Sequence, residues 1–270
     1  MPVEVKPLFR PDVVRPRVTA FSQTDDAAHN TLTVLTKWRD LLTGPGSDKL
    51  KEQEILPDFM VDIFGGVLGY QRPVDAPENY TMSQQKHVQV DGKFADAVLG
   101  EFSKDNERYV VAVEGKGPTN HLDRPFKSRK MSAVDQGYRY AINLPCDWVI
   151  VTSMRETRLY YKGADQFTFE RFEIIDLVDN ERLRKKFVYL LGAERVLRNN
   201  GTCHLDELRT ASDKVGRDLT KDFYLRYADI REDVFEQLCA NNSEVSRHDI
   251  LSAAQKMLDR ILFCAFCEGV

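Results

Sequence analysis

The sequence predicts an α/β protein in which a central mixed sheet is flanked by helices, followed by an all-helical region. Apolar residues recur at helical spacing before residue 70, which indicates amphipathic helices. Strand-like alternation and short apolar runs then occupy much of residues 94–174. After residue 176 the segments again have helical patterns, so we place a soft domain boundary there and expect two regions, 1–175 and 176–270.

Composition limits the class of protein. Of 270 residues, 42% are hydrophobic and 30% are charged, as in an ordinary globular protein. No apolar run approaches the roughly 20 residues needed to cross a bilayer. Residues 1–18 have no apolar stretch long enough for a signal peptide, so we interpret them as a loose polar arm and expect a cytoplasmic protein. The net charge of −4 argues against wholesale coating of nucleic acid, but a local basic surface is compatible with it.

Two helices are expected to open the fold. The first begins near residue 25 and ends at the Gly-Pro-Gly sequence of residues 44–46. The second begins near residue 47 and runs to Gly69, with a kink expected at Pro57.

The following elements alternate between strands and one helix. Residues 94–102 and 108–115 predict an antiparallel hairpin joined by a polar turn. The remaining expected elements are a helix at 132–143, strands at 147–152, 158–162 and 167–174, and helices at 180–197, 212–241 and 248–269. The last helix is apolar on too many sides for a free chain end, so we expect either a partner that covers it or a natural protein that continues. We interpret its Cys264 and Cys267 as helix core rather than as a redox or zinc pair.

The hairpin contains the residues that indicate chemistry. A period of two places Glu114 and Lys116 on the same face of their strand, which by itself is also typical of a salt bridge at a sheet edge. Asp96 interrupts the apolar partner strand near the open end of the hairpin, where a carboxylate needs a partner, a metal or solvent. Asp96 and Glu114 could share Mg²⁺, which prefers oxygen ligands. Lys116 could then orient or deprotonate a water that attacks phosphorus.

The helix after the hairpin supplies two further candidates. Gln136 and Tyr140 are four residues apart and therefore lie on one helical face. That face could offer an amide and a phenol to phosphate oxygens, although an amphipathic helix with a half-buried tyrosine also explains the pattern.

A basic run lies between the hairpin and this helix, from residue 124 to residue 139. A solvated surface is the simplest interpretation of such a run. We also expect Arg129, Lys130 and Arg139, together with Tyr140, to contact nucleic acid.

These residues resemble the signature of PD-(D/E)xK nucleases. Phe94-Ala-Asp96 followed by Val113-Glu114-Gly-Lys116 is similar to that signature, with Ala95 in place of the nominal proline. Gln136-x-x-x-Tyr140 is similar to the QxxxY motif of the RecB-like branch. The order of short motifs over about residues 48–268 resembles the nuclease region and helical connector of type IIG and type I single-polypeptide restriction–modification enzymes. These motifs include Leu68-Gly-Tyr70, Leu122-Asp-Arg-Pro125, Trp148-Val-Ile-Val-Thr152 and Arg158-Leu-Tyr160.

The resemblance implies a fold and an activity. We expect a restriction-endonuclease-like core and Mg²⁺-dependent endonuclease activity on DNA, of the type II restriction class that serves phage defence. The implied catalytic residues are Asp96, Glu114, Lys116 and Gln136, with Asp96 and Glu114 as metal ligands. An acidic residue from the first core helix is also implied, and here the resemblance favours Glu54 whereas periodicity favours Glu52.

The resemblance also implies partners. They are double-stranded DNA and, in cis or as a separate subunit, methyltransferase and target-recognition domains; no membrane is expected. Residues 1–270 have neither a glycine-rich S-adenosylmethionine loop nor an (N/D)PP(Y/F) motif, so S-adenosylmethionine would be needed only if a methyltransferase domain follows. Two alternatives stay open. One is a catalytically idle nuclease-like module that binds DNA or acts as a scaffold, and the other is an RNA or nucleotide hydrolase using the same site.

Overall fold

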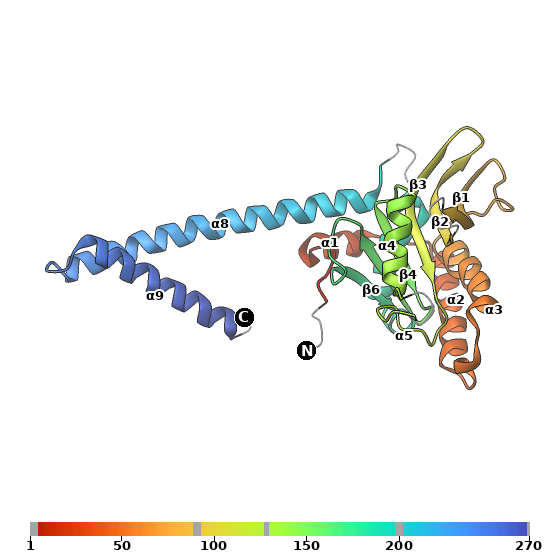
Figure 1. Ribbon diagram of the computed structural model, residues 1–270, viewed down its shortest axis with the longest axis horizontal. Helices are drawn as coiled ribbons and strands as arrows, with labels where there is room; N and C mark the ends of the chain where they lie inside the picture. Colours follow the sequence, from red (N-terminus) through yellow and green to blue (C-terminus); the bar gives the residue numbers. More distant parts are fainter. Residues whose placement is uncertain (1–4, 89–92, 127–129, 198–201, 269–270) are drawn as a thin grey trace. The chain divides into compact units, whose positions relative to one another are not determined.

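The computed structural model describes residues 5–88, 93–126, 130–197 and 202–268 (Figure 1). The chain divides into two compact units, Met1–Ser212 and Asp213–Val270. The first contains the sheet, and the second is formed by helices. The two compact units meet after Ser212, later in the chain than the change of sequence pattern near residue 176. The domain boundary expected near residue 176 stays a prediction.

A mixed sheet forms the centre of the first unit and confirms the expected α/β class. The strands follow one another in chain order across the sheet. Only β3 and β4 run parallel, and all other neighbouring pairs are antiparallel. The strands are β1 (Asn79–Val88), β2 (Lys93–Ser103), β3 (Glu107–Gly115), β4 (Trp148–Thr152), β5 (Glu156–Tyr161) and β6 (Phe169–Glu173).

The N-terminal segment corrects one expectation. Residues 1–18 were expected to form a loose polar arm, but Pro11–Ala20 form helix α1. Its Val13, Val14 and Val18 are buried, because α1 packs against α6 (Glu181–Leu191). This packing partner lies far away in sequence, so a local pattern of charges and prolines did not indicate it.

The next two helices follow the sequence only in part. Helix α2 (Asp25–Thr43) ends where the Gly-Pro-Gly sequence predicts. The second expected helix is instead divided into a short 3₁₀ turn η1 (Ser47–Lys49), helix α3 (Glu52–Phe59) and a π-helix η2 (Met60–Val67). The chain leaves η2 through Gly69, which has a φ of +81° that a side chain would strain.

Helix α4 (Ala133–Asn143) is the crossover between the parallel strands and packs on β3 and β4 (Figure 1). A capping box formed by Ser132 and Asp135 begins it. Gly137 allows close approach, since a Cβ there would lie 2.7 Å from a Val149 methyl group. On the other face of the sheet, Trp148 contacts Phe9 at 5.9 Å between ring centroids. Both faces of the central strands are therefore covered.

Further helices complete the molecule. In the first unit these are α5 (Ile174–Asp179), α6, α7 (Ala193–Val196) and the beginning of α8 (His204–Asn241). In the second unit, α9 (Arg247–Cys267) meets α8 through a hydrogen bond from Tyr227 to Asp259, 2.8 Å long. Cys264 and Cys267 are exposed on α9, so our interpretation of them as helix core is wrong for the structure described here. Among the described residues, no helix is both long and apolar enough to cross a membrane.

Candidate functional site

The hairpin brings Asp96 and Glu114 to the same end of the sheet. Ala97 pairs with Val113 across β2 and β3, so the neighbouring residues Asp96 and Glu114 lie together on the face opposite to that pair. Asp96 Oδ2 accepts a hydrogen bond from the backbone N–H of Gly115 at 2.8 Å. This bond fixes the Asp96 carboxylate beside the strand end. The sequence prediction that these two carboxylates converge is confirmed.

Lys116 completes the cluster and is held from three directions. Its Nζ donates to the Glu114 carboxylate and to the Gly115 carbonyl oxygen, the latter at 2.9 Å. Its backbone N–H donates to Thr152 O at 2.8 Å, which extends the β3–β4 ladder by one residue. The Phe126 ring lies 5.9 Å from Nζ. The side chain of Lys116 is only 8% exposed and that of Glu114 only 2%, so this ion pair is buried.

Glu52, and not Glu54, is the acidic residue that α3 brings to the hairpin. Glu52 Oε2 accepts a hydrogen bond from the Gly117 N–H at 3.1 Å. The Glu54 side chain is 59% exposed and pairs with Lys51 at 3.7 Å. The structure thus brings Glu52, which periodicity favours, to the hairpin and leaves Glu54, which the resemblance favours, exposed; a catalytic role for either residue stays a prediction.

The position of α3 depends on Gly115, the residue between Glu114 and Lys116. A Cβ at Gly115 would lie 2.5 Å from Leu56 Cδ1, so the leucine occupies the space that any side chain there would need. This contact places the first turn of α3 against the strand end. Three carboxylates and one ammonium group thus converge from β2, β3 and α3.

The electrostatics of this cluster are not balanced. The pKa of Glu114 is raised to about 8, first by burial and then by the neighbouring charge of Asp96, while Lys116 acts in the opposite direction. The charge of Glu52 adds a smaller upward contribution. One ammonium group does not neutralise the buried carboxylate of Glu114 together with the half-buried carboxylates of Asp96 and Glu52, so the cluster favours binding of a proton or another cation.

Helix α4 contributes to the packing around the cluster. A Cβ on Gly137 would lie 3.8 Å from the Glu114 Cβ, so the helix passes directly over that strand end. The adjacent Gln136 is 2% exposed, and its Nε2 donates to the Ser132 carbonyl at 3.1 Å. Tyr140 is also buried, where it belongs to the apolar core formed by α4 and the sheet. The expected direct contact of Tyr140 with nucleic acid does not fit this burial, because a buried ring is not accessible to a DNA backbone.

The expected basic surface is described in part. Arg129 lies outside the described residues. Lys130 is exposed, with a φ of +51°, at the end of the segment that leads into α4. Arg139 is half-buried, and its Nη1 lies 3.7 Å from Met131 Sδ. Lys130 is accordingly the best placed of the expected contacts for a polyanion.

Sequence reasoning missed the group that anchors the segment between Lys116 and α4. The guanidinium of Arg158 donates to both carboxylate oxygens of Asp123, at 2.6 and 3.0 Å. It also donates to Glu156 at 2.6 Å. Arg158 interrupts a short apolar strand, as Asp96 does. Because a buried charge requires partners, this position could have indicated the ion pairs from the sequence.

The candidate site fits a hard cation held by few protein ligands. Among the described residues, no group of three or more histidine, cysteine, aspartate or glutamate side chains is arranged to hold a metal ion. Mg²⁺ is commonly bound through one or two carboxylates, with water and substrate phosphate completing the shell. Asp96 and Glu114 are two carboxylates at one strand end, and a divalent cation there would relieve the repulsion by which Asp96 raises the pKa of Glu114.

Comparison with known protein families, curated proteins and solved structures finds no match for this chain.

Proposed function

We propose that this chain is a Mg²⁺-dependent nuclease that hydrolyses phosphodiester bonds in DNA, as the cleavage part of a restriction–modification enzyme. The observation that supports the proposal most strongly is the convergence of Asp96, Glu114 and Lys116 at one strand end. The under-neutralised charge of this cluster agrees with a place for a divalent cation. The hairpin, the crossover helix α4 and the parallel strand β4 also agree with a restriction-endonuclease-like core.

Asp96 and Glu114 are the residues that would hold the metal ion. When bound, Mg²⁺ would stabilise the negative charge that develops on the phosphate during hydrolysis. Asp96 is already fixed by the Gly115 N–H, so its carboxylate requires little reorganisation. Glu114 must lose its proton and loosen its bond to Lys116 before both of its oxygens become available.

Lys116 is the group that would position the attacking water. Its ammonium is held at the strand end by Glu114 and by the Gly115 carbonyl. Once Glu114 turns to a cation, Lys116 can donate to the water or to a phosphate oxygen and so orient the attack. Gln136 is held on α4 by its bond to Ser132 and supports the packing next to this site.

The proposal extends to the partners. Exposed Lys130 would contact the DNA backbone, because lysine–phosphate contacts supply much of the affinity for DNA. Target recognition and methylation would reside in other domains, in cis or in a separate subunit, and S-adenosylmethionine would be needed only there. A cytoplasmic location and a role in phage defence belong to the same proposal.

A catalytically idle, DNA-binding or scaffold module is the second candidate. The observation that favours it is the burial of the Glu114–Lys116 ion pair, which closes both groups off from solvent. In that case the cluster would stabilise the strand end and bind no metal. The two candidates differ in whether a divalent ion binds between Asp96 and Glu114.

Cleavage assays on supercoiled plasmid with Mg²⁺ or Mn²⁺ test the nuclease. We expect Asp96→Asn, Glu114→Gln and Lys116→Met each to reduce the cleavage rate by about 10³-fold or more, because each removes part of one catalytic unit. Glu52→Gln should reduce the rate less, by about tenfold, because Glu52 acts through Gly117 and through the charge of Glu114. Glu54→Gln is the matched control on the same helix and should cleave normally.

Two results would contradict the proposal. Normal cleavage by Lys116→Met would show that another site cuts the DNA. DNA binding without cleavage, combined with absence of Mn²⁺ binding in calorimetry, would instead favour the idle module. Parallel assays on duplex DNA, single-stranded DNA and RNA decide between a deoxyribonuclease and an RNA or nucleotide hydrolase.

A further inference from the structure

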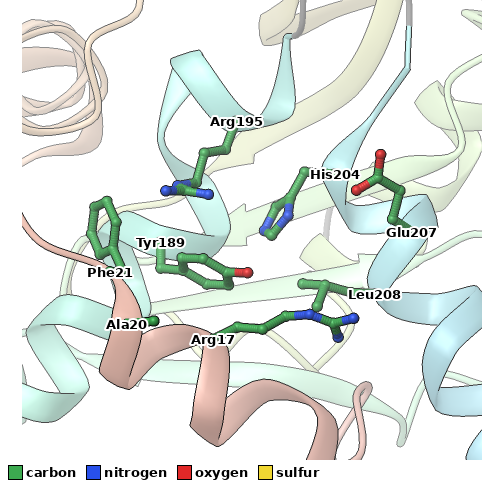
Figure 2. Close-up of a pocket in the computed structure, with 8 residues that line it drawn as sticks. All are labelled: Arg17, Ala20, Phe21, Tyr189, Arg195, His204, Glu207 and Leu208. Atoms are coloured by element: carbon green, nitrogen blue, oxygen red, sulfur yellow. The ribbon is translucent and has the colours of Figure 1, made fainter.

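A second site is formed by a pocket in the first unit, and the hairpin residues do not line it (Figure 2). It lies between α1, the ends of α6 and α7, and the first turn of α8, with a volume of about 310 Å³. This volume is at the lower end of the range found for small-molecule sites, about 300–1,000 Å³. The pocket can therefore hold a small metabolite.

Arg195 is the best oriented group in this pocket. The centre of its guanidinium lies 4.7 Å from the ring centroids of both Phe21 and Tyr189. The two rings hold the guanidinium by cation–π attraction, which leaves the N–H donors at its edge to point away from the rings. Among the described residues, none accepts a hydrogen bond from this guanidinium or forms an ion pair with it. Arg195 is thus a planar donor fork that is already oriented.

The remaining lining gives the pocket a positive balance. Arg17 enters from α1, and in the view of Figure 2 its guanidinium and that of Arg195 lie on either side of the Tyr189 ring. His204 packs edge-on against the same ring, with 4.7 Å between centroids, and adds a polar ring to the wall. Glu207 is the only carboxylate among the described lining residues, and it is exposed. Two guanidinium groups and one exposed carboxylate among the described lining residues favour an anionic ligand.

We propose that this pocket binds a small organic molecule through an oxyanion group, a phosphate or a carboxylate, with Arg195 as the bidentate donor and Arg17 as a second cation. Arginine pairs with such oxyanions through two parallel hydrogen bonds, which gives both strength and orientation. Ala20 and Leu208 add apolar wall, which suits a ligand with an organic body rather than a bare ion. Because the lining residues differ from those of the hairpin site, this proposal does not depend on nuclease activity.

Calorimetric titration of the full chain tests the proposal, in buffer freed of metal ions by a chelating resin so that none reaches the hairpin. The probes are inorganic phosphate, adenosine 5′-monophosphate, citrate and, as an uncharged comparison, adenosine. We expect the three anions but not adenosine to bind, and the preference between phosphate and citrate identifies the oxyanion. Arg195→Gln should raise the Kd by about tenfold or more, and Arg17→Gln by about threefold, since exposed Arg17 is better screened. Arg15→Gln is the matched control, because Arg15 lies on the same helix and does not line this pocket.

A second measurement protects the test against misfolding of a variant. In the unsubstituted protein, the Nε–Hε resonance of Arg195 should shift during the phosphate titration, while that of Arg15 should not. Absence of binding by every anion up to 10 mM would overturn the proposal. So would an unchanged Kd in a folded Arg195→Gln variant, or an Arg195 resonance that does not move.

Discussion

Glu114 at the end of β3 and Arg158 on β5 are both buried charged groups in the same sheet, but their surroundings balance them to different degrees. Burial by itself would lower the pKa of Arg158, but its hydrogen bonds to Asp123 and Glu156 outweigh that effect and raise the pKa. The Phe169 ring adds a cation–π contact at 4.7 Å. For Glu114, burial and Asp96 both act against the charged form, and Lys116 compensates only in part.

This difference separates a structural network from a candidate functional one. A buried charge whose partners satisfy it stabilises one arrangement of the chain. A buried carboxylate placed beside another carboxylate reduces stability, and such arrangements are common at sites where a ligand supplies the missing charge. Arg158 therefore serves the fold and the segment after Lys116, whereas Glu114 is the residue to which the proposed function assigns chemistry.

A large effect on stability is expected at Arg158. Arg158→Met should lower the free energy of unfolding by about 3 kcal/mol, because it removes a buried guanidinium that binds Asp123 and Glu156 and leaves the mostly buried Glu156 with Arg171. Arg171→Met is the matched control, since Arg171 pairs with Arg158 across the sheet and also donates to Glu156 but has a half-exposed side chain. It should cost less than about 1 kcal/mol. Urea denaturation of both variants measures the free energy of unfolding. Equal decreases in the two variants would show that the buried Arg158 ion pairs stabilise the fold no more than the exposed Arg171 pair does.

The next effect concerns pH and Glu114. Between the ordinary pKa of 4.5 and the folded value of about 8, the folded protein binds more protons than the unfolded chain. The free energy of unfolding should therefore fall as the pH rises through this window, by about 2 to 4 kcal/mol. In Glu114→Gln this contribution should disappear, so that the variant is the more stable protein at pH 8. Denaturation at a series of pH values measures it, and parallel profiles for the two proteins would refute the imbalance.

The smallest effect is the response to a divalent cation. Mn²⁺ should bind more tightly as the pH rises toward 8, by up to about tenfold per pH unit, because it competes with the Glu114 proton. At ten times its Kd, it should stabilise the fold by about 1.4 kcal/mol. Calorimetry in buffers of different ionisation enthalpy would detect the released proton. Asp96→Asn should lose the binding, while retained binding there would place the ion elsewhere.

The sequence predicted the elements whose local pattern matches their burial. The β2–β3 hairpin and β4 are largely apolar segments that are buried on both faces, and the apolar residues of α4 repeat in step with the face that it buries. It did not predict β1, because that segment is mostly polar and pairs only with β2 at the edge of the sheet. Such a strand is determined by hydrogen bonds between backbone groups, and these do not produce a recognisable pattern of side chains.

The candidate site, like the fold, could be predicted from the sequence only in part. Period two and a short turn were sufficient to bring Asp96, Glu114 and Lys116 together. The choice between Glu52 and Glu54 was not predictable, because it depends on where α3 begins and on the contact of Leu56 with Gly115. The burial of Tyr140 depends in the same way on how closely α4 approaches the sheet.

That contact at Gly115 has a consequence for which sequences can occupy this fold. The residue between the glutamate and the lysine of such a signature is nominally variable, since its own side chain takes no part in the chemistry. Here even an alanine at position 115 would force the Leu56 side chain to move, because its Cβ would lie 2.5 Å from Leu56 Cδ1 on the helix that holds Glu52. Relatives of this chain with a larger residue at that position would need a smaller residue in place of Leu56, so the two positions are expected to change together.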